Sequence, residues 1–293
     1  MRTPISPFSG FVGAALAIVL SLTGCSLLAD TDKSPSPPAH IAAIESFAVY
    51  FANPWRDTLT TFDLVVLDPD NRSAAEIQTL REHDALPIAY INLGEAETYR
   101  YFYDQVDPDW LLGPNPNWPN HYYVDARAEG WHRLLLNTVL PDIMAKGFEG
   151  LFFDMVDTAL PGLHPETRPG MIALIEKIRA AYPERTLIMN NGLFLVEDVH
   201  SSLDAQIVEN VFTRYDFEND RYIRTDSTRR NDLVGQLHKN RAEYGLRPFL
   251  INYADATDRP LRTYASRAAR KHGFLTFLST VELDTVFTAL PPQ

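Results

Sequence analysis

The sequence has a single cysteine, Cys25, so no disulfide can form within the chain. It is also short of positive charge, with 26 Lys and Arg against 38 Asp and Glu and a formal net charge of −12. Because nucleic-acid-binding proteins present a basic surface, this balance argues against a nucleic-acid partner. Hydrophobic residues make up 45% of the 293 positions, enough for a sizeable core in one large domain or two small ones.

The motifs of several common enzyme classes are also missing. There is no Gly-rich phosphate loop, no dinucleotide-binding fingerprint and no G-x-S-x-G nucleophile elbow. The 8 histidines are scattered, with neither an H-E-x-x-H motif nor a Cys/His cluster that could hold zinc. The sequence therefore predicts no metal centre and no cofactor, and we expect His121 and His132 to be structural or surface residues.

The N-terminus has the pattern of an export signal. Arg2 supplies a positive start, and the apolar stretch FVGAALAIVLSL that follows is too short for a stable membrane span. The stretch runs into LTGC (22–25), which resembles the bacterial lipobox, a motif whose cysteine is lipidated. The resemblance implies a lipid anchor at Cys25. The alternative is an ordinary secretory signal with a chance cysteine.

This pattern divides the chain into three parts. Residues 1–24 are predicted to be a lipoprotein signal peptide, and 25–43, rich in proline and serine, a tether between the anchor and the domain. Residues 44–293 are predicted to form the folded domain. Ser26, which follows the cysteine where some lipoproteins carry aspartate, implies sorting to the outer membrane if the source is Gram-negative.

Short apolar runs alternate with stretches of helical period along this domain. The runs are continuous, as expected of parallel strands covered on both faces. They span 46–51, 63–68, 87–92, 122–125, 150–154, 186–190, 205–209, 248–252 and 274–279. Repeated βα units over about 250 residues favour a single (β/α)8 TIM barrel. A doubly wound sheet is the rival, but the turn after the first run lacks its glycines.

Nine runs are one too many for this barrel. The run YYVD (122–125) is the shortest and follows a long loop, so we predict that it forms an extra strand-like extension before barrel strand four. The run GLFFD (150–154) then becomes strand four, and AQIVE (205–209) becomes strand six.

Candidate site residues stand where the predicted strands end, because TIM barrels carry their chemistry at the C-terminal ends of the strands. The predicted substrate contacts are Tyr50, Asp68, Glu95, Asp125, Arg127, Asn190, Asn252 and Tyr253. Asp154 and Glu209 stand apart, because each directly ends an apolar strand, where charge is costly to bury. Two carboxylates facing each other across a barrel mouth suit glycoside hydrolysis. The alternative is that each acid pairs with an arginine such as Arg127 or Arg214.

Six ordered motifs between about residues 45 and 280 resemble those of glycoside hydrolase family 114. They are DLVVLDPDN, PIAYINLGEAE, YYVDARAEGW, KGFEGLFFDMVDT, LIMNNG and IVENVFTRY. The family comprises endo-acting α-1,4-polygalactosaminidases and similar bacterial TIM-barrel proteins. The resemblance implies that Asp154 and Glu209 are the catalytic pair and that anomeric configuration is retained. Asp154 would then be the nucleophile and Glu209 the general acid/base.

A retaining mechanism adds geometric expectations. The two carboxyl groups should lie about 5–5.5 Å apart, because an inverting enzyme needs a wider gap for a water molecule. Asp154 needs a nearby donor, for which Arg127 and the Asn190 amide are candidates. Glu209 should have a pKa raised by burial and by the charge of Asp154.

The loop 94–123 is long and rich in aromatic residues. Long loops in compact domains are usually functional, and sugar rings present apolar faces that stack on aromatic side chains. Tyr99, Trp110 and Trp118 are therefore candidate platforms for a sugar chain. The alternative is that they pack the loop onto the barrel.

Together these patterns predict a lipid-anchored, metal-independent and monomeric glycoside hydrolase of the bacterial cell envelope. Its predicted substrate is an α-1,4-linked, galactosamine-containing polysaccharide, cleaved internally. Two alternatives stay open: a polysaccharide-binding lipoprotein that has lost turnover, and a glycosidase for a different exopolysaccharide.

Overall fold

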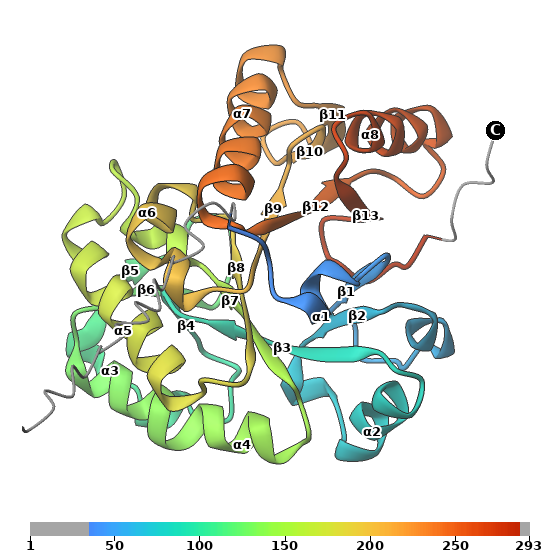
Figure 1. The fold of residues 1–293 in the computed structure, drawn as a ribbon. Coiled ribbons are helices and arrows are strands. Elements are labelled where there is room, and N and C mark those ends of the chain that lie inside the picture. Colours follow the sequence, from blue (N-terminus) through green and yellow to red (C-terminus); the bar gives the residue numbers. More distant parts are fainter. Residues whose placement is uncertain (1–34, 288–293) are drawn as a thin grey trace, which may run out of the picture. The chain divides into compact units, whose positions relative to one another are not determined.

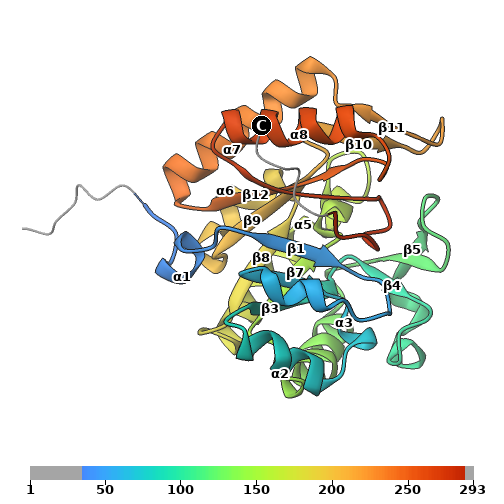
Figure 2. The same cartoon turned by 90° about the vertical axis from the view of Figure 1, so that its right-hand side faces the viewer.

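The computed structural model describes residues 35–287, so the predicted signal peptide and Cys25 lie outside the described residues. Eight strands form a nearly closed barrel in the order β1-β2-β3-β7-β8-β9-β12-β13, and all neighbours in that order are parallel (Figures 1 and 2). They are β1 Phe47–Tyr50, β2 Leu64–Leu67, β3 Leu86–Asn92, β7 Gly150–Asp154, β8 Thr186–Asn190, β9 Ala205–Glu209, β12 Arg247–Tyr253 and β13 Leu275–Ser279. The predicted TIM barrel is confirmed.

Helices flank this barrel on the outside (Figure 1). They are α1 Ala39–Ala42, α2 Ala74–Glu82, α3 Glu129–Leu134, α4 Leu140–Ala145, α5 Arg168–Ala181, α6 Val196–Val199, α7 Ser227–Tyr244 and α8 Arg259–Lys271. A π-helical turn, Leu135–Val139, joins α3 to α4. Among the described residues, no helix is long and apolar enough to cross a membrane.

The first helix corrects the predicted edge of the tether. Ile41 in α1 is fully buried, and Arg247 donates hydrogen bonds to the carbonyl oxygens of Ile41 and Ala42, at 2.5 and 2.8 Å. Residues 39–43 therefore belong to the folded domain, and a boundary at residue 44 is a few residues too late. The proline-rich composition just before α1 hid this short helix.

Two insertions extend the chain beyond the C-terminal ends of barrel strands. After β3, the strands β4 Glu95–Glu97, β5 Leu111–Pro114 and β6 His121–Val124 form an antiparallel sheet in the order β4-β6-β5. The run YYVD contributes to β6, so its predicted place outside the barrel is confirmed. After β9, the chain forms the hairpin β10 Thr213–Asp216 and β11 Arg221–Arg224, which the sequence did not predict.

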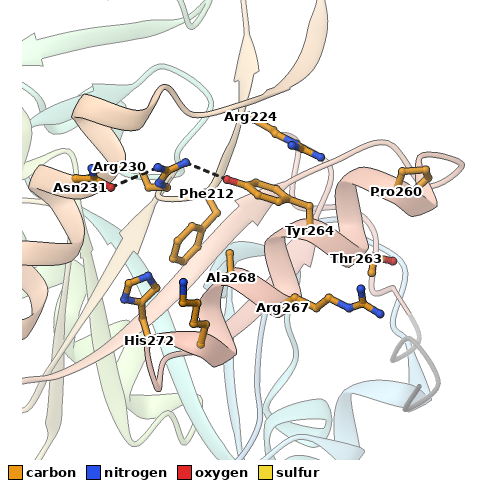
Figure 3. A pocket seen from close by; sticks show the side chains of 11 residues that line it. Phe212, Arg224, Arg230, Asn231, Pro260, Thr263, Tyr264, Arg267, Ala268 and His272 are labelled. Atoms are coloured by element: carbon orange, nitrogen blue, oxygen red, sulfur yellow. Dashed lines mark hydrogen bonds between the residues drawn. The ribbon is translucent and has the colours of Figure 1, made fainter.

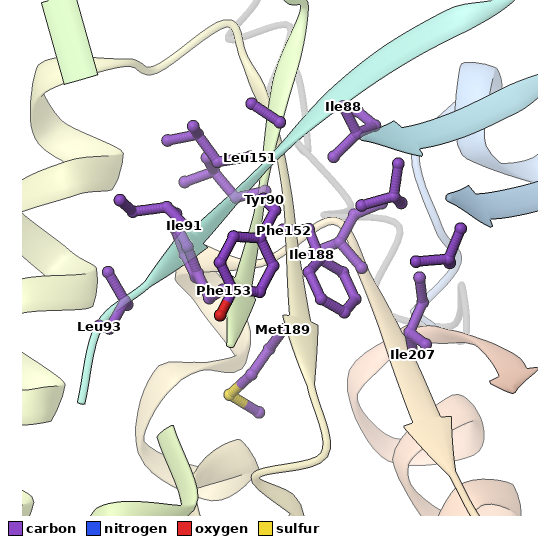
Figure 4. Close-up of a cluster of buried hydrophobic side chains, with 14 of the residues drawn as sticks. Ile88, Tyr90, Ile91, Leu93, Leu151, Phe152, Phe153, Ile188, Met189 and Ile207 are labelled. Carbon is purple, nitrogen blue, oxygen red and sulfur yellow. The ribbon is translucent and has the colours of Figure 1, made fainter. Parts of the chain in front are cut away.

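The core explains why the strand sequences are continuously apolar. In β7, Leu151, Phe152 and Phe153 are all at most 1% exposed, because one strand face meets the barrel interior and the other meets the helices (Figure 4). Burying each such side chain contributes about 1.5–3 kcal/mol. The next residue, Asp154, is partly exposed. The change from apolar to acidic residue thus marks the point where β7 leaves the core.

Candidate active site

Asp154 and Glu209 converge on a single amide group. Asn190, at the end of β8, lies between them, and its Nδ2 donates to Asp154 Oδ1 at 2.9 Å and to Glu209 Oε1 at 2.7 Å. Because both bonds share one nitrogen, the two oxygens are no further apart than the sum of these lengths, 5.6 Å. Three adjacent strands therefore place the two carboxylates side by side.

Further hydrogen bonds hold Glu209 in position. The hydroxyl of Tyr253, at the end of β12, donates to Glu209 Oε2 at 2.8 Å, so each oxygen of this carboxylate has its own donor. The backbone N–H of Glu209 donates to Asn191 Oδ1 at 3.0 Å. Side chains locked in this way keep a reactive geometry without reorganisation during the reaction.

The backbone turns sharply after each of the three strands that carry these groups. Met155, Asn191 and Asn210 directly follow Asp154, Asn190 and Glu209, and their φ angles are 56°, 52° and 63°. Asparagine tolerates this left-handed region, but for methionine it is a strained conformation that costs about 1–2 kcal/mol. Strain of this kind is concentrated at functional sites.

The electrostatic environment makes the two acids unequal. Burial, followed by the charge of Asp154, raises the pKa of Glu209 to about 7, although the bonds from Asn190 and Tyr253 oppose the rise. Burial also raises the pKa of Asp154, while its bonds from Asn190 and from the Met155 backbone N–H oppose that rise. The charge of Asp154 therefore favours the protonated form of Glu209.

Asp154 and Glu209 do not pair with Arg127 or Arg214, the partners that the alternative to a catalytic pair required. Arg127 makes a two-pronged ion pair with Asp125, at 2.8 and 2.9 Å, and Arg214 donates to the Tyr215 carbonyl oxygen, at 3.5 Å. Within residues 35–287, no ion pair involves Asp154 or Glu209. Of the two donors predicted for Asp154, Asn190 is therefore correct and Arg127 is wrong.

The chain matches the family model of glycoside-hydrolase family GH114 over residues 28–291. It belongs to this family. The protein is therefore a glycoside hydrolase. Among its relatives, an uncharacterized protein from Deinococcus radiodurans is 26% identical, covering 88% of this chain and 87% of the relative.

Two solved structures share the fold of this GH114 hydrolase. One is the glycoside hydrolase domain of PelA from Pseudomonas aeruginosa, with a TM-score of 0.75 and 23% identity, covering 83% of this chain and 97% of that domain. The other is Aspergillus fumigatus Ega3 in complex with galactosamine, with a TM-score of 0.66 and 16% identity, covering 82% of this chain and 92% of that one.

The β4-β6-β5 sheet of the GH114 domain brings a further acid toward the pair. Glu95 is only 1% exposed and accepts hydrogen bonds from Asn115 Nδ2 at 2.6 Å and from His121 Nδ1 at 3.0 Å. Although burial lowers the pKa of His121, its bond to Glu95 raises that pKa above its ordinary value. The charge of Glu95 contributes to the raised pKa of Asp154.

A second buried acid, Glu97, was missed by the sequence analysis. It accepts from Tyr90 and Tyr99 hydroxyls, at 3.2 and 2.9 Å, and from Arg100 Nε. Its charge also raises the pKa of Asp154. The dyad EAE, two acids on one face of a strand beside an aromatic loop, was the only signal in the sequence that could have singled it out.

Arg100 connects the predicted contact Asp68 to this group of acids. Its Nη1 lies 2.7 Å from Asp68 Oδ1 and 3.1 Å from Asp70 Oδ2, while its Nε pairs with Glu97. Asp68 therefore belongs to an ion-pair network that joins the end of β2 to the β4-β6-β5 sheet.

Two predicted substrate contacts do not fit that role. Tyr50 is fully buried, with its hydroxyl donating to the Pro54 carbonyl oxygen at 2.9 Å and accepting from Arg56 Nε at 3.2 Å. Asn252 is likewise fully buried and uses both ends of its amide inside the fold. Its Oδ1 accepts from the N–H groups of Phe212 and Thr213, at 2.8 and 3.0 Å, and so secures the start of the hairpin.

The aromatic loop divides into a packed part and an exposed part. Trp110 packs against Gly130, where an added Cβ would lie only 2.0 Å from its ring, so this tryptophan is structural. Trp118 is half-buried and meets Phe217 of the hairpin edge to face, with ring centroids 5.7 Å apart. Tyr99 and Phe217 are 59% and 52% exposed. Phe217 escaped the sequence analysis because its partner lies about a hundred residues away in the chain.

Proposed function

We propose that this glycoside hydrolase cleaves an α-1,4-linked, galactosamine-containing polysaccharide internally and retains the anomeric configuration. The observation that carries the mechanism is the shared Asn190 amide, which keeps the nearest oxygens of Asp154 and Glu209 within 5.6 Å, the sum of its two bonds. This spacing suits a direct nucleophile, whereas inverting enzymes separate their carboxyl groups by about 6.5–9.5 Å.

The proposed reaction assigns one role to each acid. Glu209, protonated because its pKa is raised to about 7, donates its proton to the glycosidic oxygen as the bond to the anomeric carbon breaks. Ionised Asp154 attacks that carbon and forms a glycosyl ester. Glu209 then removes a proton from water, which attacks the same carbon, releases the sugar and returns Asp154 to its carboxylate. Asn190 and Tyr253 hold the acids in place throughout.

The charge around the pair supports an amino sugar as substrate. A galactosamine residue with a free amine is cationic at neutral pH, and Glu95 and Glu97 lie near enough to Asp154 to raise its pKa. The formal net charge of −12 attracts a cationic polymer over longer range. The comparison with Ega3, whose structure contains galactosamine, points the same way. The exposed rings of Tyr99 and Phe217 suit stacking by a sugar chain rather than by a single sugar.

The direct test is a reducing-end assay on a partially deacetylated galactosaminoglycan. We expect oligosaccharides of mixed length, as an internal cut produces, and a first product of retained configuration by NMR. Glu209→Gln should lower kcat by about 10²–10⁴-fold, the usual contribution of a general acid. Asp198→Asn, which removes a surface acid paired with Arg168, is the matched control and should keep full activity.

Other outcomes separate the alternatives. Binding of the polymer without release of reducing ends would support a protein that has lost turnover. Neither binding nor release would point to a different exopolysaccharide. Inverted product would refute the role of Asp154 as nucleophile while leaving the pair intact.

A further inference from the structure

A pocket of about 700 Å³ lies apart from the carboxylate pair, between α7 and α8 (Figure 3). None of Asp154, Asn190, Glu209 and Tyr253 lines it. One face of α8 forms a wall, because Pro260, Tyr264 and Lys271 and their lining neighbours recur at helical spacing. Its size falls in the range of small-molecule sites.

The pocket is basic in a protein that is strongly acidic overall. Arg224, Arg230, Arg267 and Lys271 all line it, and no Asp or Glu is among the lining residues, all of which belong to the described part of the chain. Arg224 and Arg230 form no ion pair with any carboxylate described between residues 35 and 287. Because Arg224 and Arg230 lack a carboxylate partner among these residues, an anion that entered between them would be stabilised.

Tyr264 positions two of these cations in advance. The guanidinium carbon of Arg224 lies 4.1 Å from the centroid of the Tyr264 ring, and Arg230 Nη1 donates to the Tyr264 hydroxyl at 3.2 Å (Figure 3). Contacts of this kind lower the side-chain entropy that a ligand would otherwise have to overcome. Each guanidinium keeps further N–H groups that can be directed at an anion.

The floor of the pocket is aromatic. Phe212 and His272 are stacked, with ring centroids 5.8 Å apart and an interplanar angle of 25°. Burial first, and then neighbouring positive groups that include Lys271 and Arg230, lower the pKa of His272. A mostly neutral, apolar floor beneath a ring of cations suits a ligand with an anionic group and a flatter uncharged part.

We propose that this pocket is a second ligand site, which binds a phosphate-bearing molecule. Guanidinium groups match the geometry of phosphate oxygens with paired hydrogen bonds. A phosphate monoester carries about −1.5 to −2 charges at neutral pH. It can therefore pair with more cationic side chains than a single carboxylate can. The phosphate can belong to a soluble sugar phosphate or to a lipid headgroup.

The soluble source is tested by calorimetry on the full-length chain, with glucose 6-phosphate as probe and glucose as neutral control. We expect wild type to bind the phosphate and not glucose, and added salt to weaken the binding. The double variant Arg224→Gln/Arg230→Gln should bind at least about tenfold more weakly, because it loses two charge-assisted interactions with the phosphate. Circular dichroism checks that it folds.

The matched control is Arg241→Gln/Arg270→Gln, which removes the same charge from α7 and α8 but outside the pocket lining. It should bind as wild type does. The lipid source is tested with phosphatidylcholine vesicles that do or do not contain phosphatidic acid, by comparing the two double variants. The phosphate is assigned to a lipid if Arg224→Gln/Arg230→Gln binds phosphatidic acid vesicles more weakly than the control variant does. The two variants should then bind pure phosphatidylcholine vesicles equally.

Two results would overturn the proposal. One is that wild type binds neither glucose 6-phosphate nor phosphatidic acid vesicles in preference to the neutral probes. The other is that both double variants bind alike, which would make the attraction a general charge effect.

Discussion

At the scale of single residues, Asn190 is the group on which both acids depend. Its amide contacts Asp154 at 2.9 Å and Glu209 at 2.7 Å, and its bonds lower the pKa of each from the value that burial alone would set. A side chain without this amide, such as alanine, could neither align the two carboxylates nor favour their charged forms.

Asn190→Ala should lower kcat/KM by about 10- to 100-fold, the loss expected for a hydrogen bond to a charged group. Because the bonds lower both pKa values, their removal should move both limbs of the pH–rate profile to higher pH. The measurement is kcat/KM against pH for wild type and variant. A fall in activity with an unmoved profile would show that Asn190 acts on geometry alone.

Glu209 should destabilise the fold at neutral pH. Its pKa rises from 4.5 to about 7 on folding, so the folded state holds the proton more tightly than the unfolded chain. The contribution of this group to the free energy of unfolding is therefore fully present below pH about 4.5 and is lost as the pH rises through about 7. Glu209→Gln cannot ionise and should escape this loss.

We therefore expect the stability of Glu209→Gln relative to wild type to increase between pH 5 and pH 8, by about 1–3 kcal/mol. Thermal or urea unfolding at several pH values measures it, with Asp198→Asn as a surface-acid control. A difference that stays constant with pH would contradict the raised pKa.

At the scale of elements, the two insertions build the surroundings of the mouth. The β4-β6-β5 sheet contributes Glu95 and Glu97, and the β10–β11 hairpin contributes Phe217, which meets Trp118 of the long loop. The barrel strands supply the carboxylate pair, whereas elements inserted between strand and helix supply the extended surface that a polymer needs.

Trp118→Ala/Phe217→Ala should raise KM for the polymer by about 3- to 10-fold, since an aromatic pair contributes about 0.5–1.5 kcal/mol beyond its buried area. The kcat should change little, because the two rings belong to the inserted segments, whereas the acids end the barrel strands β7 and β9. Tyr182→Ala, at the end of α5, is the aromatic control. An equal rise in KM for the polymer and for an activated monosaccharide would argue against a role of these rings in binding the polysaccharide chain.

At the scale of the whole molecule, the sequence pattern of the N-terminus predicts attachment to a membrane. Residues 35–287 contain no helix able to cross a membrane. We propose that a lipid on Cys25 holds the hydrolase in the bacterial envelope, with the residues before α1 as a tether.

Cys25→Ser should prevent incorporation of labelled palmitate and move the protein from the membrane to the soluble fraction. A single acyl chain anchors weakly, so stable attachment implies several chains on this cysteine. The measurement is palmitate labelling together with fractionation, with activity in the soluble fraction showing that the barrel remains folded. Labelling that persists in Cys25→Ser would place the lipid elsewhere.

The strands and the two acids could be predicted from the sequence because of how a parallel barrel is covered. Both faces of β7 and β9 are buried, so β7 appears as a continuous apolar run and β9 as one interrupted only by Gln206. The first acid of each run marks the end of the strand. Asp154 and Glu209 could therefore be placed at the ends of their strands without the fold. The extra run YYVD could also be separated from the barrel by its length and position.

Only the tertiary structure decided which rim residues face the pair. Tyr50 ends β1 and Asn252 directly precedes Tyr253 at the end of β12. The polar atoms of Tyr50 and Asn252 bond elsewhere in the fold, whereas the Tyr253 hydroxyl reaches Glu209. Glu97 is brought in by a sheet whose strands are separated in sequence. The direction of a side chain at a strand end depends on the twist of the backbone and on partners far along the chain, and neither is encoded in the local pattern of residues.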